Sequence, residues 1–264
     1  MSSINRKPPG IIFNKVMIML IIFNVAKYTS AKPNLDTEAQ VTEYVNNITD
    51  FNSIGGINYS IKRIDVNEDE TPFLQEKIKG IKNVWLVEAK HVRLRLKSAI
   101  PGYRDRYNRK FNILVDPNTG NILKITSKYD GYDPDMRPEP NAVSAERQLR
   151  ASGEIYLGFP DVPPSINFLD ALDIILKDGV GSPFSAKEID ALYVMYSRRN
   201  SKPCRAWVIT LRGIPPLPVS IPPGASREIA EQVWGYNHIR TVINDETGKI
   251  LLMTNWPQPD NIQK

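Results

Sequence analysis

The sequence is poor in the residues from which metal and thiol sites are built. It holds one cysteine, Cys204, and two histidines among 264 residues. A single cysteine cannot form an intramolecular disulfide, so the fold is not held together by cysteine bridges. A zinc site needs three or four convergent ligands, and neither His91 nor His238 is accompanied by such a cluster. We therefore expect no metal and no cofactor.

Motifs for catalysis are missing as well. The chain contains no Gly-x-Ser-x-Gly nucleophile elbow, and it has neither a Gly-x-Gly-x-x-Gly motif nor a phosphate-binding loop. Asp130, Asp133 and Asp135 are spaced like part of a calcium loop, but the glycine and distal glutamate of such a loop are absent. We predict that the protein is not an enzyme; a hydrolase with dispersed catalytic residues is the enzymatic alternative.

Long hydrophobic runs are confined to the beginning of the chain. Basic residues at Arg6, Lys7 and Lys15 precede an apolar run over 16–23, and small residues follow at 29–31. This is the pattern of an export signal, and the run is too short to cross a bilayer, which needs about 20 residues. We predict a signal peptide over 1–31 and a secreted or periplasmic protein without a membrane span. An uncleaved leader that anchors the chain is the alternative.

The basic character of the chain belongs mostly to this leader. The whole sequence has a formal net charge of +5. The leader holds four of the 34 Lys and Arg and none of the 29 Asp and Glu, so 30 against 29, or +1, remains without it. Because the remaining charge is nearly balanced, we expect no nucleic acid partner.

What the sequence does contain is an internal repeat. Four landmarks occur twice in the same order: a tryptophan, an Ile-Pro break that ends in glycine, a Tyr-Asn pair and a Thr-Gly-x-Ile-Leu segment. They lie at Trp85, 100–102, 107–108 and 119–123 in the first half, and at Trp207, 221–224, 236–237 and 247–251 in the second. A repeat of this length predicts that one architectural unit occurs twice.

Each repeat is expected to begin with a helix and to continue as an antiparallel sheet. Thr37 and Gln40 have the spacing of a capping box, and a helical stripe of apolar residues follows over 41–48. A second stripe over 169–176 follows Ser165 as the N-cap and ends at Gly179. Strands are predicted over 85–96, 111–115, 122–125, 193–196, 207–211, 239–243 and 249–253. The predicted fold is α+β, with two tandem repeats in which a helix packs on a small antiparallel sheet.

The domain boundaries follow from the repeat and from a proline-rich stretch between its copies. They are 1–31 for the signal peptide, 32–128 for the first repeat, 129–141 for the linker, 142–256 for the second repeat and 257–264 for a tail.

The recurring segments carry a family resemblance. Trp85-Leu86-Val87 with 115–123, and Trp207-Val208-Ile209 with 243–251, resemble the PepSY domain, a small α+β module of secreted and membrane-attached bacterial proteins. The sequence departs from the motif at Asn244, where the first copy has Asp116, and in long segments between tryptophan and turn. The resemblance implies an extracytoplasmic interaction module, proposed in some cases to restrain peptidases, with no catalytic residues.

Two surfaces are candidates for binding. The first is a basic row of alternating residues on the predicted strand 85–96 and just after it: His91, Arg93, Arg95 and Lys97. The second is the proline-rich loop 213–224, whose apolar residues Ile214, Leu217, Val219 and Ile221 suit a partner that recognises an extended segment. Each has a structural alternative: a solvated strand face for the row, and a loop folded onto its own domain for the second.

These features predict a secreted or periplasmic binding protein whose partner is another extracytoplasmic protein, such as a peptidase. The alternative partner is an anionic envelope polymer or lipid headgroup held by the basic row.

Overall fold

The computed structural model describes residues 33, 35–65, 83–100, 105, 108–129, 154–179, 181–198, 201–214, 224 and 237–257. The chain divides into two compact units, Met1–Pro33 and Asn34–Lys264. All the helices and strands named below belong to the second unit. The predicted signal peptide, nearly all of the linker and all but the first residue of the predicted tail lie outside the described residues.

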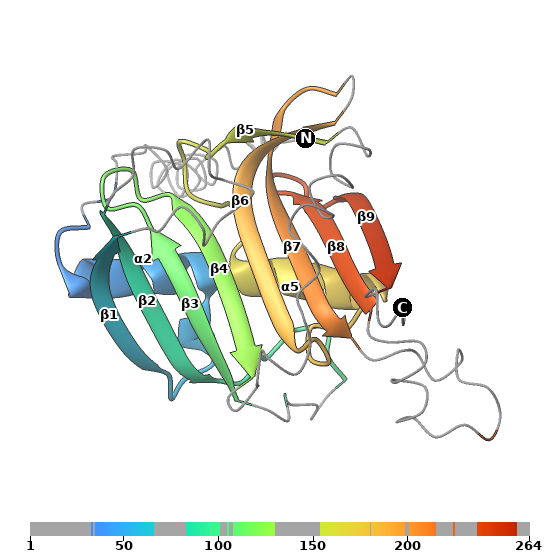
Figure 1. Ribbon diagram of the computed structural model, residues 1–264, viewed down its shortest axis with the longest axis horizontal. Helices are drawn as coiled ribbons and strands as arrows, with labels where there is room; N and C mark the ends of the chain where they lie inside the picture. Colours follow the sequence, from blue (N-terminus) through green and yellow to red (C-terminus); the bar gives the residue numbers. More distant parts are fainter. Residues whose placement is uncertain are drawn as a thin grey trace, which may run out of the picture. The chain divides into compact units, whose positions relative to one another are not determined.

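The described strands form one antiparallel sheet of nine (Figure 1). They are β1 (Asn58–Asp65), β2 (Asn83–Val92), β3 (Arg109–Val115), β4 (Ile122–Tyr129), β5 (Glu154–Gly158), β6 (Glu188–Arg198), β7 (Cys204–Ile214), β8 (Asn237–Asn244) and β9 (Ile250–Pro257). The order across the sheet is β1-β2-β3-β4-β6-β7-β8-β9, and β5 pairs with one end of β6.

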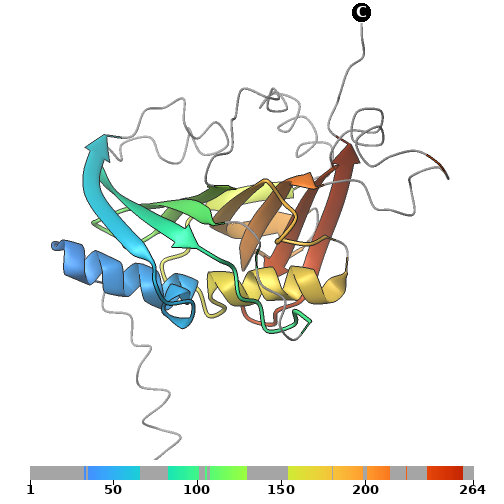
Figure 2. The ribbon, with the colours of Figure 1, turned by 90° about the horizontal axis from the view of Figure 1, so that it is seen from below.

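Two helices, α2 (Glu38–Thr49) and α5 (Phe168–Asp178), lie end to end on one face of the sheet (Figure 2). Thr37 caps α2, and the predicted capping box with Gln40 is confirmed. At α5 the prediction of Ser165 as N-cap is wrong, because the side chain of Asn167 accepts the hydrogen bond from Asp170 N at 2.7 Å. Neither helix reaches the length and hydrophobicity that a membrane span requires, within the residues described.

The prediction of two separate helix-on-sheet repeats is wrong. The fold is mostly β, with nine strands in one sheet. The two halves are not separate, because β4 of the first half (35–129) pairs directly with β6 of the second half (154–257). Four residue pairs make this junction, from Ile125 opposite Ala191 to Lys128 opposite Glu188. An unpaired β4 edge would leave backbone groups without partners, so the edges meet and the two small sheets expected from the sequence become one.

The hydrophobic core is also shared between the halves. Phe51 and Phe111 of the first half pack edge to face at 5.0 Å between ring centroids, and Phe168 of α5 lies 5.8 Å from Phe111. Phe168 in turn lies 5.9 Å from Trp207. All four side chains belong to one buried cluster that fills the space between the helices and the sheet. The halves therefore share the main core, and two smaller buried clusters lie on strands of one half each.

Within this single sheet the two halves have matching local geometry. The indole nitrogens of Trp85 and Trp207 donate to the carbonyl oxygens of Leu35 and Ile166, each at 2.8 Å. These two bonds tie the segment before each helix to a strand of the same half, β2 in the first and β7 in the second. The β3–β4 and β8–β9 turns are likewise closed by the same backbone hydrogen bonds.

The predicted strand 85–96 ends early. Its pairing with β3 shifts register between Ala89 and Val92, and His91 at this bulge has a φ of 62°. A bulge bends a strand and ends regular pairing, so the chain leaves the sheet at Val92 and residues 93–96 are irregular. The basic row therefore does not form one strand face.

Candidate functional site

The segment that leaves β2 keeps its alternation of buried and exposed side chains. Val92, Leu94 and Leu96 are buried in the core. The four residues of the predicted basic row, His91, Arg93, Arg95 and Lys97, are exposed. The alternation predicted these exposures, although it assigned them to a strand. The segment continues past the core toward the ends of the two helices, where a pocket lies.

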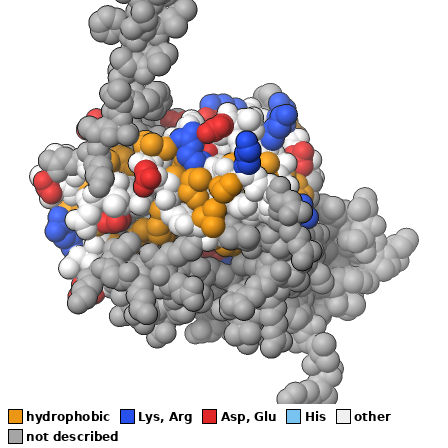
Figure 3. All heavy atoms as spheres, turned by 90° about the horizontal axis from the view of Figure 1, so that it is seen from above, with side chains coloured by type: hydrophobic (Ala, Val, Ile, Leu, Met, Phe, Trp, Pro, Cys, Tyr) orange, Lys and Arg blue, Asp and Glu red, His pale blue; other side chains and the backbone are white. Residues whose placement is uncertain are grey.

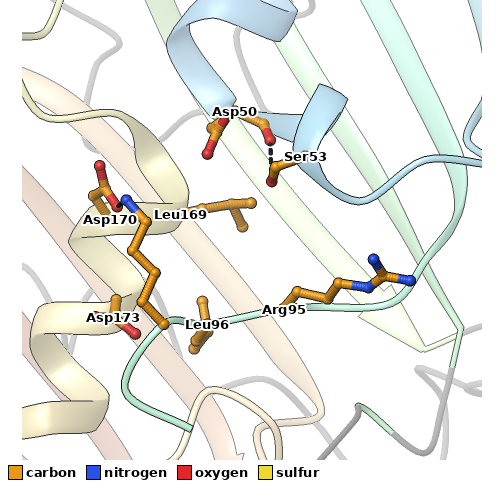
Figure 4. Close-up of a pocket in the computed structure, with 8 residues that line it drawn as sticks. Asp50, Ser53, Arg95, Leu96, Leu169, Asp170 and Asp173 are labelled. Atoms are coloured by element: carbon orange, nitrogen blue, oxygen red, sulfur yellow. Dashed lines mark hydrogen bonds and ion pairs between the residues drawn. The ribbon is translucent and has the colours of Figure 1, made fainter.

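The pocket has a volume of about 230 Å³ and lies where α2, α5 and the segment after β2 come together (Figure 4). We call it the junction pocket. Its lining residues are Asp50, Ser53, Arg95, Leu96, Lys97, Leu169, Asp170 and Asp173. The first two come from the end of α2 and the short 3-10 helix η2 (Phe51–Ser53), and the last three come from α5. Both halves of the sequence therefore contribute to one site.

Ion pairs across the junction hold one wall of the pocket. Lys97 Nζ lies 2.6 Å from Asp170 Oδ1, and this hydrogen bond, reinforced by the charge of Asp170, raises the pKa of Lys97 above its usual value. Asp173 accepts hydrogen bonds from both the backbone nitrogen and the hydroxyl of Ser98, at 2.6 and 2.7 Å. These carboxylates are engaged, so they position the segment after β2 against α5.

Two charged groups of the pocket remain available. The guanidinium of Arg95 makes no hydrogen bond or ion pair within the described part of the chain, and it points away from Asp170 and Asp173 (Figure 4). The carboxylate of Asp50 likewise makes no hydrogen bond there, although its backbone carbonyl accepts one from Ser53 Oγ at 2.8 Å. With Leu96 and Leu169 as apolar lining, the pocket offers one cation, one anion and a small hydrophobic surface to a ligand.

The pocket shows no arrangement for covalent or metal chemistry. Among the described residues, no group of three or more His, Cys, Asp or Glu is placed to hold a metal ion. The chain's cysteine lies in β7, and burial raises the pKa of the Cys204 thiol. A raised pKa disfavours the thiolate, which is the nucleophilic form.

Arg109 is a fully buried charge with a structural role, and it was not singled out from the sequence. Its Nε donates to Asp105 at 2.9 Å, and its terminal nitrogens donate to the carbonyl oxygens of Pro183, Phe184 and Ala186 at 2.9 to 3.2 Å. The guanidinium also stacks on the Tyr129 ring at 4.3 Å. Arg109 of β3 thus binds the segment before β6, and it fastens the two halves beside the β4–β6 junction.

In the second half a buried carboxylate has a similar structural role. Asp245 accepts hydrogen bonds from the backbone nitrogens of Ser165 and Ile166, at 2.8 and 3.0 Å. It also accepts one from the Tyr193 hydroxyl at 3.0 Å. Burial, together with the charge of Asp245, raises the pKa of Tyr193. The segment before α5 is thereby fixed to the β8–β9 turn.

The structure describes five of the eight predicted site residues. Of these five, Arg95 and Lys97 line the junction pocket, whereas His91, Arg93 and Ile214 are not among its lining residues. Ile214 is buried at the end of β7, with 6% of its surface exposed. Arg93 is held by Asn108 Oδ1 at 2.7 Å from its Nε. Leu217, Val219 and Ile221 of the proline-rich loop lie outside the described residues.

Charges of both signs are interspersed on the part of the surface that Figure 3 shows, with hydrophobic side chains between them. The described portion of this face carries no extended field of a single sign.

Comparisons with known proteins assign no family. No protein-family model matches the chain, and no curated protein matches its sequence. A solved structure of a "putative lipoprotein" from Clostridium difficile 630 is similar at 13% identity and a TM-score of 0.20, over 82% of this chain and 92% of that one. A likeness at this score bears on neither fold nor function. The PepSY resemblance therefore stays a prediction, and no established family supplies an activity.

Proposed function

We propose that this is a non-enzymatic binding protein that acts outside the cytoplasm and whose partner is another protein. The leader-like pattern of residues 1–31 supports the location. The observation that carries the binding role is that Arg95, whose guanidinium has no partner among the described residues, lines the junction pocket together with Leu96 and Leu169. If the PepSY resemblance holds, the partner is a peptidase.

The pocket suits an acidic side chain of such a partner. Arginine presents its donors in a planar fork that matches a carboxylate, and a charge-assisted bond of this kind is about twice as strong as a neutral one. Leu96 and Leu169 line the pocket beside it. A partner residue that combines a short apolar stem with a carboxylate, as glutamate does, contacts both features.

The alternative partner is an anionic envelope polymer. It is favoured by the exposure of all four basic-row residues, His91, Arg93, Arg95 and Lys97. At least two of these are already engaged, since Lys97 pairs with Asp170 and Arg93 donates to Asn108. Because a polymer binds by summing many phosphate or carboxylate contacts, a row with two engaged cations is a weak polymer site. A protein partner with one anchoring acid needs only Arg95.

Capture from the native extracytoplasmic fraction tests the proposal. Tagged wild-type protein and the Arg95→Ala variant are compared, with Arg198→Ala as the matched control, because Arg198 is an exposed arginine at the far end of β6. We expect Arg95→Ala to weaken capture of the identified partner about tenfold or more, the equivalent of one hydrogen bond to a charged group. Equal capture by the wild type and Arg95→Ala would contradict the site.

Salt separates the two classes of partner. At about 1 M salt the Debye length falls to about 3 Å, and contacts between exposed charges are screened. A protein interface with an apolar component should survive this treatment, whereas binding to an anionic polymer should be lost. Recovery of a polymer alone, at low salt only, would replace the first proposal by the second.

A further inference from the structure

The sheet ends in two strands whose outer edges have no partner strand among the described residues. These are β1 and β9, at opposite ends of the strand order (Figure 1). An unpaired edge presents a row of backbone N–H and C=O groups that can template another strand, and proteins commonly protect such edges with charge.

The chain itself contains one example of two such strand edges pairing with each other. At the β4–β6 junction, the last strand of the first half meets the second strand of the second half in antiparallel register. Ile125 lies opposite Ala191, Thr126 opposite Asp190, Ser127 opposite Ile189 and Lys128 opposite Glu188. The core-facing members of these pairs, Ile125, Ala191 and Ile189, are fully buried.

The free edge of β9 corresponds to the β4 edge of this junction. Both strands follow the same turn, in which the glycine nitrogen donates back across the turn: Gly120 to Asp116 at 2.8 Å and Gly248 to Asn244 at 2.9 Å. Both then carry a register shift two residues later, at Ile122 and Ile250. Counting from either landmark, 253–256 of β9 match 125–128 of β4.

The free edge of β1 corresponds in the same way to β6. Arg63 of β1 lies opposite Trp85 on β2, and Tyr193 of β6 lies opposite Trp207 on β7. The two tryptophans make the same indole hydrogen bond, so they fix the register. Residues 58–61 of β1 therefore match 188–191 of β6.

The chemistry of the two free segments fits this match. Neither Asn58-Tyr59-Ser60-Ile61 nor Met253-Thr254-Asn255-Trp256 contains a charged residue. The charges of β1, at Lys62, Arg63 and Asp65, lie beyond the four matching positions. Ile61 and Met253 are only partly buried at the two ends of the core, whereas their counterparts Ala191 and Ile125 are 0% exposed.

Side-chain types across the match and at the helix ends are compatible with this pairing. The match places Ser60 opposite Thr254, and Ser–Thr pairs of this kind stabilise neighbouring strands. On the helix face, the exposed end of α5 carries Lys177 and Asp178, and the exposed first turn of α2 carries Glu38. Lys177 of one copy and Glu38 of the next are opposite charges, in the same end-to-end order in which α2 precedes α5.

We propose that copies of this protein associate head to tail, with β9 of one copy added to β1 of the next. Met253 pairs with Ile61 of the second copy, Thr254 with Ser60, Asn255 with Tyr59 and Trp256 with Asn58. The two surfaces differ, so the contact is heterologous and produces a ring or an open chain of copies. The β4–β6 junction inside the chain is the template for this intermolecular one.

Paired edge variants test the proposal by sedimentation velocity. The wild type should form species larger than a monomer whose size grows with concentration. Met253→Lys blocks the β9 side and Ile61→Lys blocks the β1 side, so each variant alone should be monomeric, with an apparent dissociation constant raised about 30-fold or more, as for a central interface residue. An equimolar mixture should form dimers and nothing larger, because each copy keeps one intact edge.

The outcomes are distinct. Pairing of β9 with β9 of another copy would leave Ile61→Lys associated and the mixture no different from its components, and this overturns the proposal. A wild type that remains monomeric at its solubility limit overturns it too. Circular dichroism checks that each variant is folded, and Ser60→Lys, at an exposed position of β1, replaces Ile61→Lys if that variant does not fold. Association is measured without any partner, so its failure is separate from failure of the proposed function.

Discussion

At the scale of single residues, buried charge joins the two halves. The Arg109 guanidinium is 0% exposed and is satisfied by one carboxylate, three carbonyl oxygens and one aromatic ring. A buried ion pair contributes little net stability compared with an apolar pair, but removing one member leaves an uncompensated charge. The geometry makes Arg109 a structural residue that other cations cannot replace, because the bonds need the planar fork of arginine.

The first stability prediction concerns this residue. Arg109→Ala should lower the free energy of unfolding by about 3–5 kcal/mol, because Asp105 and three carbonyl groups lose their partner. Arg109→Lys should recover only part of the loss. Urea denaturation measures both, with Arg198→Ala as the control at an exposed position, where a change within about 0.5 kcal/mol is expected. A loss below 1 kcal/mol in Arg109→Ala would show that water replaces these contacts.

At the scale of elements, the two hairpin turns explain a difference between the copies. In the first turn the Asp116 carboxylate accepts from Asn118 N and Thr119 Oγ1, at 2.9 and 2.7 Å. In the second turn the Asn244 side-chain oxygen accepts from Glu246 N, Thr247 N and Thr247 Oγ1 at 2.8 to 3.0 Å. Both turns need an acceptor at this position, and either side chain supplies one.

This equivalence gives a prediction for the turn. Asp116→Asn should change the free energy of unfolding by less than about 1 kcal/mol, since one amide oxygen has two lone pairs and can take over both bonds of the two carboxylate oxygens, as Asn244 Oδ1 accepts several bonds in the second turn. Asp116→Ala should cost about 1–3 kcal/mol, because the Thr119 hydroxyl and the Asn118 N–H, whose hydrogen bonds are partly buried, lose their charged acceptor. Thermal and urea unfolding of the two variants give the comparison. Equal losses in both would mean that the negative charge, rather than the acceptor, is what the turn requires.

At the scale of the whole molecule, one sheet and one core make the halves interdependent. Residues of both halves share the same buried cluster, and the aromatic contacts from Phe51 through Phe168 to Trp207 cross the junction. Small single-core proteins unfold cooperatively. Residues 35–257 should accordingly behave as one cooperative unit.

Calorimetry of the wild type should show one unfolding transition, with the van't Hoff and calorimetric enthalpies equal. Phe168→Ala removes the ring at the centre of the junction and should cost about 3–5 kcal/mol. Amide exchange should then accelerate equally in β2 and β7. Phe168 and β7 belong to the second half, whereas β2 belongs to the first. Two separate transitions, or faster exchange in β7 alone, would show that the halves unfold independently.

The candidate site was only partly predictable from the sequence, because residues of both halves contribute to it. Alternation of apolar and basic residues after Trp85 identified Arg95 and Lys97 as exposed. The residues that complete the pocket, Asp50, Asp170 and Asp173, carry no sequence signal, because aspartates are common near helix ends for capping. Lys97 and Asp170 are 73 residues apart, and nothing local links them.

The sequence by itself determined the features that depend on consecutive residues. The capping box at Thr37, the alternation within the strands and the glycine turns at Gly120 and Gly248 follow from side-chain spacing and backbone preference, which act over a few residues. Only the tertiary structure decided that β4 pairs with β6, that Arg109 bridges the halves and that one core replaces two. The β4–β6 pairs join residues 60 to 66 apart, and the hydrogen bonds of Arg109 to the second half join residues 74 to 77 apart. These contacts form because an unpaired strand edge and an incompletely covered apolar surface are both unfavourable in water.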